Sequence, residues 1–519
     1  MSSKPLCGQA RIGWIVGEST PLRSYVLFDK GHVPRAGSYI TAEGDEGCVL
    51  GVLEKVVRGN MIVTEDVTDA SQLGVITKYK DLDREHYTRG VVRWLSLADP
   101  LRNQGKVVSP SIPLEPASPI YQAPSSLLHD IFAGMSKRWV RIGALAGNPN
   151  VEFSIDVNKL TRHLAILAVT GGGKSNTVNI LAHRIVSGLG GTMVIFDIHG
   201  EYAVAASNLA PGRAVVKQPV VNPLEINFHE LKRLARIPDG AHVQERILRE
   251  AWKAVLQKYP SKYTPGTSFL DALRIEVRRA GSQMKRQDSM QGTLNRIDDI
   301  EDYYGQILDE RTHRRLTDII EPGKLNIFDL SGIDEVAADA VVSHYMRRIL
   351  EERKIHKRTQ GASGYPVPLL VVVEEAHVLI PRDEDTLTKT WASRIAREGR
   401  KFGVGLVLVS QRPKNVDADV LSQTNNKIIL KIVEPSDQRY VQAASEQLSE
   451  DLLELLPALN PGEAIVIGSM TKLPAMVKID YCADICGVTT GGADIDVVKE
   501  WEKYNSGSGD EDLNPEVFA

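Results

Sequence analysis

Hydrophobic positions follow two different rhythms along the chain. Up to about residue 135, short apolar runs such as RIGWIVGES and GCVLGVLEKVV are separated by glycine, proline and aspartate. Short strands with frequent turn signals are typical of a small barrel or sandwich. A stretch rich in proline and serine, residues 109–126, predicts an extended linker near the end of this region. We therefore expect an N-terminal small β-barrel domain over residues 1–135.

From residue 136 onward, apolar runs alternate with helical stretches. Continuous runs of Val, Ile and Leu bounded by turns are typical of strands buried on both faces of a mostly parallel sheet. The pattern predicts an α/β core over residues 136–485, with helices on both faces of the sheet. The predicted core strands are residues 163–169, 192–198, 324–330, 368–375, 403–410, 426–433 and 463–469.

Two segments depart from this alternation. Residues 224–320 have helical periodicity without a strong strand signal, which predicts a helical subdomain inserted between two core strands. Residues 486–519 predict a C-terminal helix followed by a mobile tail rich in glycine, serine and acidic residues.

Composition indicates the cellular compartment of the protein more than the reaction that it performs. The formal net charge of -4 gives no sign of nucleic acid binding, although a groove can concentrate positive charge on one surface. The N-terminus lacks the apolar segment of a signal peptide, and no apolar run is long enough to span a membrane. Four cysteines are too few for a disulfide scaffold and are expected as thiols. We expect a cytoplasmic protein without membrane contact.

The stretch LAVTGGGKSN, residues 167–176, nearly matches the phosphate-binding pattern G-x-x-x-x-G-K-[ST], with Ala168 in place of the first glycine. It lies between a predicted strand and a predicted helix, as a P-loop requires. Backbone N–H groups of such a loop surround phosphate, the lysine reaches the β- and γ-phosphates, and the hydroxyl holds Mg²⁺. The alternative is a structural glycine-rich turn. The predicted ATP-binding residues are Thr170, Gly171, Gly172, Gly173, Lys174, Ser175 and Asn176.

The run LLVVVEEAH, residues 369–377, ends in two carboxylates. An apolar strand followed by two acids is the Walker B arrangement. Here Glu374 stands where aspartate is commoner and is predicted to organise Mg²⁺, while Glu375 is predicted to polarise the attacking water. The alternative is a strand that simply ends in a charged turn.

A third strand, in VLVSQRP, ends in Ser410 and Gln411. In RecA-like ATPases a polar residue at this strand end senses the γ-phosphate or positions water. We predict that role for Gln411; the alternative is a glutamine that contacts loop backbone.

Basic residues crowd the segment SRIAREGRKFG, residues 393–403. One interpretation is a solvated basic face or cations at a helix C-terminus. The other is an arginine finger that reaches the nucleotide of a neighbouring subunit, with Arg400 as first candidate and Arg397 or Lys401 as alternatives. Arg162 precedes the predicted strand before the P-loop, whose seven residues place it roughly 20 Å from that loop, so it is expected either to act in trans or to be an ordinary surface arginine.

The segment FDIHGEY, residues 196–202, follows the second core strand. Asp197, His199 and Glu201 resemble a metal cluster in composition. Beside a P-loop, these side chains are expected to orient water, Mg²⁺ or sensor residues instead of binding zinc.

These motifs, in this order, together with EPSDQRYVQAAS and a β-rich N-terminal domain, resemble the HerA DNA translocases of archaea, in the HerA–FtsK branch of RecA-like motor ATPases. The resemblance covers essentially the whole chain. The family usually has a glycine at the position of Ala168 and T-G-S-G-K-S where this chain has T-G-G-G-K-S. The resemblance implies a homohexameric ring around double-stranded DNA and a NurA-type nuclease partner in end resection during double-strand-break repair.

DNA would be held by basic residues in connections that follow core strands. The candidates are Arg213, Lys217 and Arg382, each with the alternative of an ordinary surface cation. Phosphate contacts of this kind are sequence-independent and sensitive to salt.

The motifs therefore predict an ATP-dependent DNA helicase or translocase that uses ATP and Mg²⁺. Two other functions remain open from the sequence: a conjugation or secretion motor ATPase, and a P-loop switch whose ATP binding controls assembly only. The need for an arginine in trans favours an oligomer, most naturally a ring.

Overall fold

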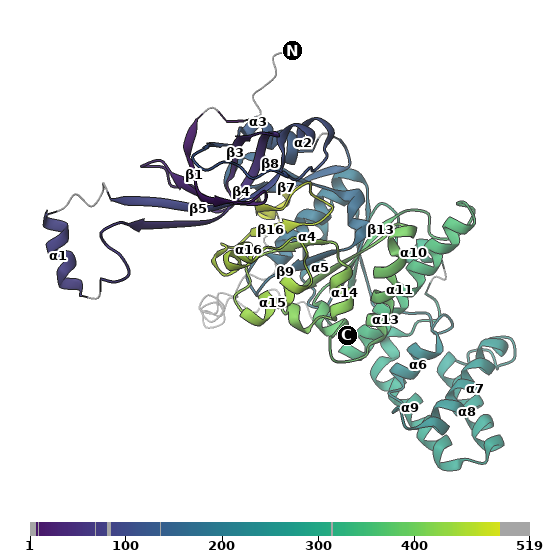
Figure 1. The fold of residues 1–519 in the computed structure, drawn as a ribbon. Coiled ribbons are helices and arrows are strands. Elements are labelled where there is room, and N and C mark those ends of the chain that lie inside the picture. The colour runs from purple at the N-terminus through teal and green to yellow at the C-terminus, as the bar shows by residue number, and fades with distance from the viewer. Residues whose placement is uncertain are drawn as a thin grey trace, which may run out of the picture.

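The computed structural model describes residues 7–487, except 9, 68, 80–84, 135 and 313–314. Figure 1 shows a β-barrel, a central α/β core and a helical lobe on the side of the core away from the barrel. The predicted C-terminal helix and tail, residues 486–519, lie outside the described residues except for residues 486 and 487.

The N-terminal domain is a closed barrel with the strand order β1-β2-β5-β4-β3-β6. Its interior is filled by alternate residues of these strands, among them Ile15, Val26 and Val92, which are fully buried. Two long strands extend beyond the barrel and lead to helix α1 (Ala70–Tyr79), as Figure 1 shows. The strands are β1 (Arg11–Ser19), β2 (Arg23–Phe28), β3 (Tyr39–Gly44), β4 (Gly47–Asn60), β5 (His86–Leu97) and β6 (Pro119–Gln122).

Within the stretch 109–126, expected as a linker, residues 119–122 form the barrel strand β6. Strand β6 pairs with both β1 and β3 and closes the barrel, and α3 (Ser125–Phe132) begins directly after it. Ile120 in β6 is fully buried. The expectation of a linker was wrong because four residues carry little periodicity, and their partners are distant in sequence.

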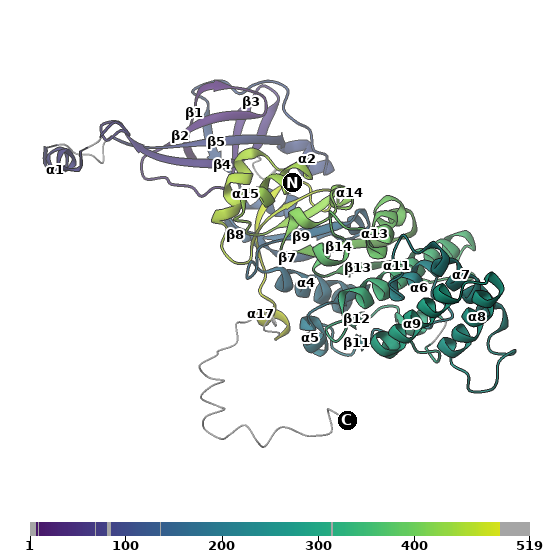
Figure 2. The same cartoon turned by 90° about the horizontal axis from the view of Figure 1, so that it is seen from below.

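The core is one sheet with the order β11-β12-β10-β13-β14-β9-β15-β16-β17-β7-β8. Neighbours from β11 to β15 are parallel and those from β15 to β8 antiparallel, which confirms the predicted α/β fold. Helices lie on both faces (Figure 2). The strands are β7 (Trp139–Leu145), β8 (Asn148–Asp156), β9 (Leu164–Leu167), β10 (Thr192–Asp197), β11 (Ala214–Lys217), β12 (Leu325–Asp329), β13 (Leu369–Val373), β14 (Val404–Ser410), β15 (Asn426–Ile429), β16 (Glu463–Ile467) and β17 (Ala475–Ile479).

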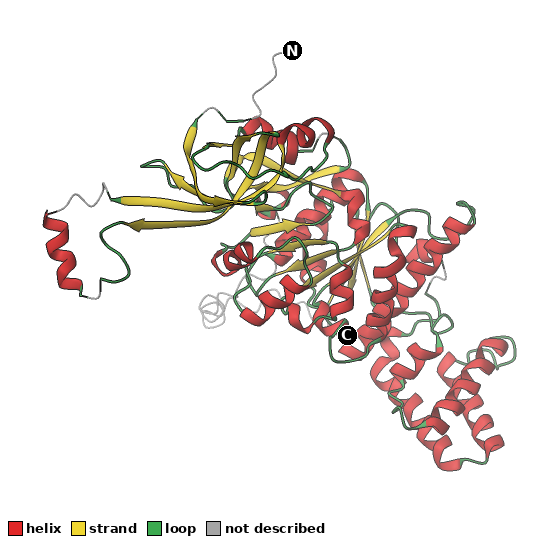
Figure 3. Cartoon of the chain, viewed as in Figure 1, coloured by secondary structure: helices red, strands yellow, loops and turns green. Residues whose placement is uncertain are grey.

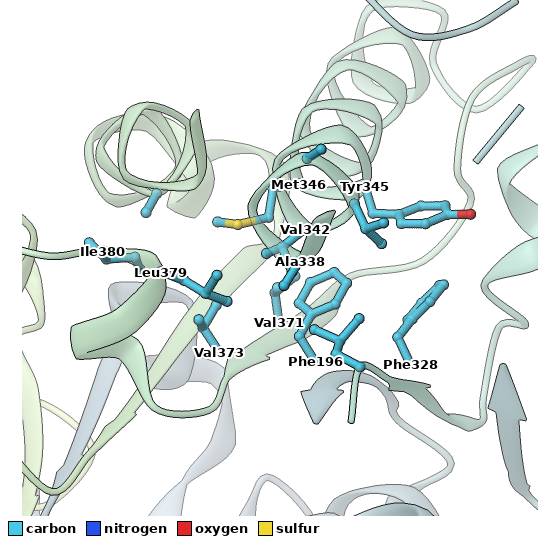
Figure 4. Packing of buried hydrophobic residues seen from close by; sticks show 14 of the residues in the cluster. Phe196, Phe328, Ala338, Val342, Tyr345, Met346, Val371, Val373, Leu379 and Ile380 are labelled. Atoms are coloured by element: carbon cyan, nitrogen blue, oxygen red, sulfur yellow. The ribbon is translucent and has the colours of Figure 1, made fainter. Parts of the chain in front are cut away.

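Helix α11 (Glu335–Arg358) covers the parallel part of the sheet. Figure 4 shows its side chains packed against Phe196, Phe328 and Val371 of three adjacent strands. The ring of Phe328 lies 4.6 Å from that of Tyr345 on α11 and 5.4 Å from that of Phe196, measured between centroids. This packing holds the strand ends that carry the candidate site.

The helical lobe lies between β11 and β12 in the chain. Figure 3 shows it as an all-helical part of the molecule. A buried ionic cluster ties it to α11: Glu230 lies 3.1 Å from His344 and 3.0 Å from Arg347. The lobe comprises α6 (Phe228–Leu234), α7 (His242–Lys258), α8 (Phe269–Met284) and α9 (Gln287–Tyr304), while α10 (Leu316–Ile319) lies beside α11 (Figure 1).

The four cysteines form two disulfides, Cys7–Cys48 and Cys482–Cys486, contrary to the expectation of thiols. The first joins residues 41 positions apart, a pairing that spacing alone does not reveal. Among the helices in the described part of the chain, none is both long and apolar enough to cross a membrane.

His163 predicts a pH-dependent contribution to stability. Its buried Nδ1 accepts the backbone N–H of Leu406 at 3.0 Å, and burial lowers its pKa from 6.5 to about 4. The unfolded chain therefore binds a proton that the folded chain does not, and stability falls by up to roughly 3 kcal/mol as pH drops from 6.5 towards 4. Thermal unfolding at pH 7 and pH 5 should show a smaller decrease for His163→Gln than for the parent. Equal decreases would assign the effect to other groups.

Candidate ATPase site

The P-loop lies between β9 and α4 (Lys174–Ala182). Gly171 and Gly173 have φ of +73° and +104°, in the left-handed region that glycine adopts without strain. A Cβ on Gly172 would lie 2.9 Å from the Cβ of Ala168, so this position also requires glycine. Lys174 and Ser175, half-buried, begin the helix, whose N-terminal N–H groups favour an anion. The loop therefore has the conformation of a phosphate-binding site.

Ala168 lies behind this loop, not in it. Its side chain is fully buried, its N–H donates to the Ser410 carbonyl at 3.3 Å, and its φ is not in the left-handed region. Nothing in this backbone requires glycine.

Replacing Ala168 with glycine should therefore change the Kd for ATP by less than about threefold. The variant should lose about 1 kcal/mol of stability, because a buried methyl group is removed and backbone freedom increases. Titration of both proteins with ATP, together with thermal unfolding, checks both values. A tenfold gain in affinity would instead show that alanine distorts the loop.

The two Walker B carboxylates have different surroundings. Glu374, which follows β13, is buried against Asp197 at the end of β10. Burial, and then the mutual repulsion of the two carboxylates, raises the pKa of Glu374; burial also raises that of Asp197. Glu374 Oε2 and Asp197 Oδ1 have no hydrogen-bond partner among the described atoms. Unpartnered hard oxygens beside a phosphate site suit Mg²⁺, which binds through one or two carboxylates plus phosphates.

Glu375 is buried and has a φ of +43°, an unusual conformation for a residue with a side chain. Such strain often marks functional positions. Burial opposes its charge, but His377, Lys174 and His199 nearby lower the pKa of this carboxyl below its usual value. Glu375 is thus held as a carboxylate, the form that a proton acceptor requires.

Gln411 contacts the P-loop directly. The Thr170 hydroxyl donates to Gln411 Oε1 at 2.7 Å, so a residue 241 positions away joins the strand end of β14 to the loop. The structure thus brings together the P-loop, Glu375 and Gln411, as the sequence predicted.

Glu201 is a further site residue. The Ser175 hydroxyl donates to Glu201 Oε2 at 2.9 Å, and Glu201 lies in the first turn of α5 (Glu201–Leu209). Asp197 accepts the N–H groups of Tyr202 and Ala203, which fixes the start of this helix. The D-x-H-x-E spacing singled out Glu201 but did not indicate its partner.

Asn176 contributes differently from the rest of the loop. Its side chain donates to the Asp480 carbonyl at 2.9 Å and accepts the Cys482 N–H at 2.8 Å. Only its backbone is available to a nucleotide, and its amide ties the P-loop helix to the chain after β17.

The arginine candidates lie at the opposite edge of the sheet. Arg400, exposed, precedes β14, whose far end carries Gln411; seven strand residues span roughly 20 Å. Arg162 precedes β9, a strand of four residues, on the same side of the sheet. Arg397, on α13 (Leu387–Glu398), is exposed, and its Nε donates to the Ser393 carbonyl. At this distance Arg400 cannot reach the P-loop of its own chain.

The DNA candidates differ in accessibility. Lys217 forms a 2.8 Å ion pair with Glu321, and Arg213 lies against the Val186 carbonyl. Arg382 is exposed and lies over the ring of Tyr440, 5.7 Å from its centroid. Arg382 also lies 3.7 Å from Asp383, Arg213 is exposed as well, and the DNA role of all three stays a prediction.

A glycine-rich phosphate loop, two carboxylates and a polar residue on adjacent parallel strand ends define a P-loop ATPase of the RecA-like type. The fold is similar to the structure of VirB4 of Thermoanaerobacter pseudethanolicus, with a TM-score of 0.50 and 16% identity over 67% of this chain and 97% of that one.

Sequence comparisons give the family. Residues 140–349 match the model for "Helicase HerA, central domain", and residues 359–484 match "Helicase HerA-like C-terminal". The chain is 41% identical to the DNA double-strand break repair helicase HerA of Sulfurisphaera tokodaii, over 95% of this chain and 96% of that protein. It is 33% identical to the protein of the same name from Pyrococcus furiosus, over 89% and 91%. The chain belongs to the HerA helicase family, which confirms the predicted family and class of enzyme, an ATP-dependent helicase.

Proposed function

We propose that this protein is an ATP-driven translocase of double-stranded DNA that acts with a NurA-type nuclease in the resection of broken DNA ends. Relatives that align with this chain over nearly its whole length are named DNA double-strand break repair helicases. These names support a role in DNA repair. The observation that carries the ATP-driven part is the meeting of the P-loop, Glu375 and Gln411 at one edge of the sheet.

Hydrolysis follows from these positions. Glu375, held as a carboxylate, takes a proton from the water that attacks the γ-phosphorus, and Gln411 orients that water. Lys174 stabilises the charge on the transferring group while the bond to ADP breaks. Mg²⁺, held by Ser175 and Glu374, would neutralise charge on the β- and γ-phosphates.

We further propose a ring, most simply a hexamer, working in the cytoplasm. Arg400 lies at the edge of the sheet remote from the P-loop, so it can serve only a neighbour's nucleotide, and Arg162 precedes β9 on the same side. A closed ring supplies one such neighbour to every subunit.

The experiment is ATP hydrolysis by a sized oligomer, with and without double-stranded DNA. A DNA motor should be stimulated at least tenfold, and the stimulation should fall as salt rises, because phosphate contacts release counterions. A P-loop assembly switch should show little stimulation. A secretion motor should respond to a protein substrate and not to DNA.

A further inference from the structure

His377 occupies a position between the strand ends that carry the two water-handling residues. It lies in the short helix α12 (Ala376–Leu379), directly after Glu375, and is largely buried. Its Nδ1 lies 3.1 Å from Glu375 Oε2 and 3.3 Å from Ser410 Oγ. One ring nitrogen therefore lies close both to Glu375, which follows β13, and to Ser410 at the end of β14.

The contact with Glu375 is close but not aligned as a hydrogen bond, because Glu375 Oε2 has no such partner among the described atoms. Contacts of catalytic groups are often long or misaligned without substrate and become aligned when it binds. The carboxylate of Glu375 is buried, and His377 Nδ1 lies 3.1 Å from its Oε2. His377 is therefore placed to fix the orientation of this carboxylate.

Ser410 continues the connection. Its hydroxyl also accepts the N–H of Arg412, which fixes the turn around Gln411. Gln411 in turn accepts the hydroxyl of Thr170 in the P-loop. The contacts thus run from Glu375 through His377 and Ser410 to the residue that faces the loop.

We propose that His377 is a positioning residue that orients the Glu375 carboxylate and couples it to Ser410 and Gln411, so that base and sensor move together when nucleotide binds. This inference rests on the proposed role of Glu375 in hydrolysis. A purely structural histidine would not need its contacts with Glu375 Oε2 and Ser410 Oγ. Its loss would reduce folding stability without a selective effect on turnover.

The test compares His377→Ala and His377→Asn in the full-length oligomer, with DNA present. Alanine should lower kcat for ATP about 10- to 100-fold with KM changed less than about threefold, because a base displaced by about 1 Å loses that much rate. Asparagine, whose amide N–H takes the place of Nδ1–H, should restore at least a third of the lost activity.

Several outcomes overturn the proposal. They are an unchanged kcat in His377→Ala, a loss confined to KM, or no recovery with asparagine in a variant that melts at the parent's temperature. If the alanine variant does not fold, Ser410→Ala, which removes the other partner of the same nitrogen, should lower kcat severalfold; an unchanged kcat would contradict the coupling.

The same series separates this inference from the proposed function. Full hydrolysis by Glu375→Gln would remove Glu375 as the base and the proposed mechanism with it. An inactive Glu375→Gln beside a fully active His377→Ala would leave the mechanism intact and reject only the positioning role. When both single variants are impaired, adding His377→Ala to Glu375→Gln should lower the residual rate no further, because the two residues act as a unit.

Discussion

Glu375→Gln should bind ATP as tightly as the parent and hydrolyse it at least 100-fold more slowly. Glutamine keeps the size and position of the side chain, but its neutral amide cannot accept a proton from water. The parent carboxylate is kept ionised by Lys174 and His377 although it is buried, so its loss removes a base that the surroundings were arranged to hold. General bases of this kind contribute about 10²- to 10⁴-fold.

The measurement is ATP binding by equilibrium titration and turnover under saturating ATP and DNA. Glu384→Gln, the same substitution on an exposed loop residue, is the matched control and should behave as the parent. Turnover within threefold of the parent in Glu375→Gln would exclude this residue as the base. A parallel loss of binding would instead indicate a collapsed site.

Arg400→Ala should lower DNA-stimulated hydrolysis by about 10³-fold, whereas Lys401→Ala should have little effect. An arginine finger stabilises charge that develops on the transferring phosphoryl group and is worth 10³ to 10⁵ in kcat. Both residues are exposed in the turn before β14, so their surroundings are similar. They differ in the charged group, a guanidinium in Arg400 and an ammonium in Lys401. The Lys401 variant therefore controls for loss of a positive charge at this edge.

Mixing two inactive variants tests whether the arginine acts in trans. Lys174→Ala subunits lack their own site but keep Arg400, and Arg400→Ala subunits keep their site. Interfaces between the two should regain hydrolysis, up to a fraction set by the mixing ratio. Absence of recovery, with mixed oligomers demonstrated by two distinct affinity tags, would contradict the assignment. Equal losses in Arg397→Ala and Arg400→Ala would leave the choice of finger open to Arg397.

The core strands and the P-loop were predictable because their signals are local. Every apolar run that predicted a core strand forms one, since burial on both faces of a parallel sheet demands a continuous apolar segment. Gly171 and Gly173 before Lys174 adopt left-handed φ angles that few other residues adopt, so the glycines of the sequence indicate the conformation of the loop. Strands β7, β8, β11 and β17 were missed because edge and antiparallel strands carry weaker, alternating patterns.

The sequence by itself determined the fold class, the central core strands and the group of residues expected at the nucleotide site, because parallel strands present their carboxyl ends at one edge of the sheet. Only the tertiary structure decided which of these residues touch. The contacts of Ser175 with Glu201, of Thr170 with Gln411, and of His377 with Ser410 join positions 26, 241 and 33 apart. The closure of the barrel by β6 has the same origin. Such pairings depend on how the strands are ordered side by side, and nothing in the local pattern of a short segment specifies its distant neighbour.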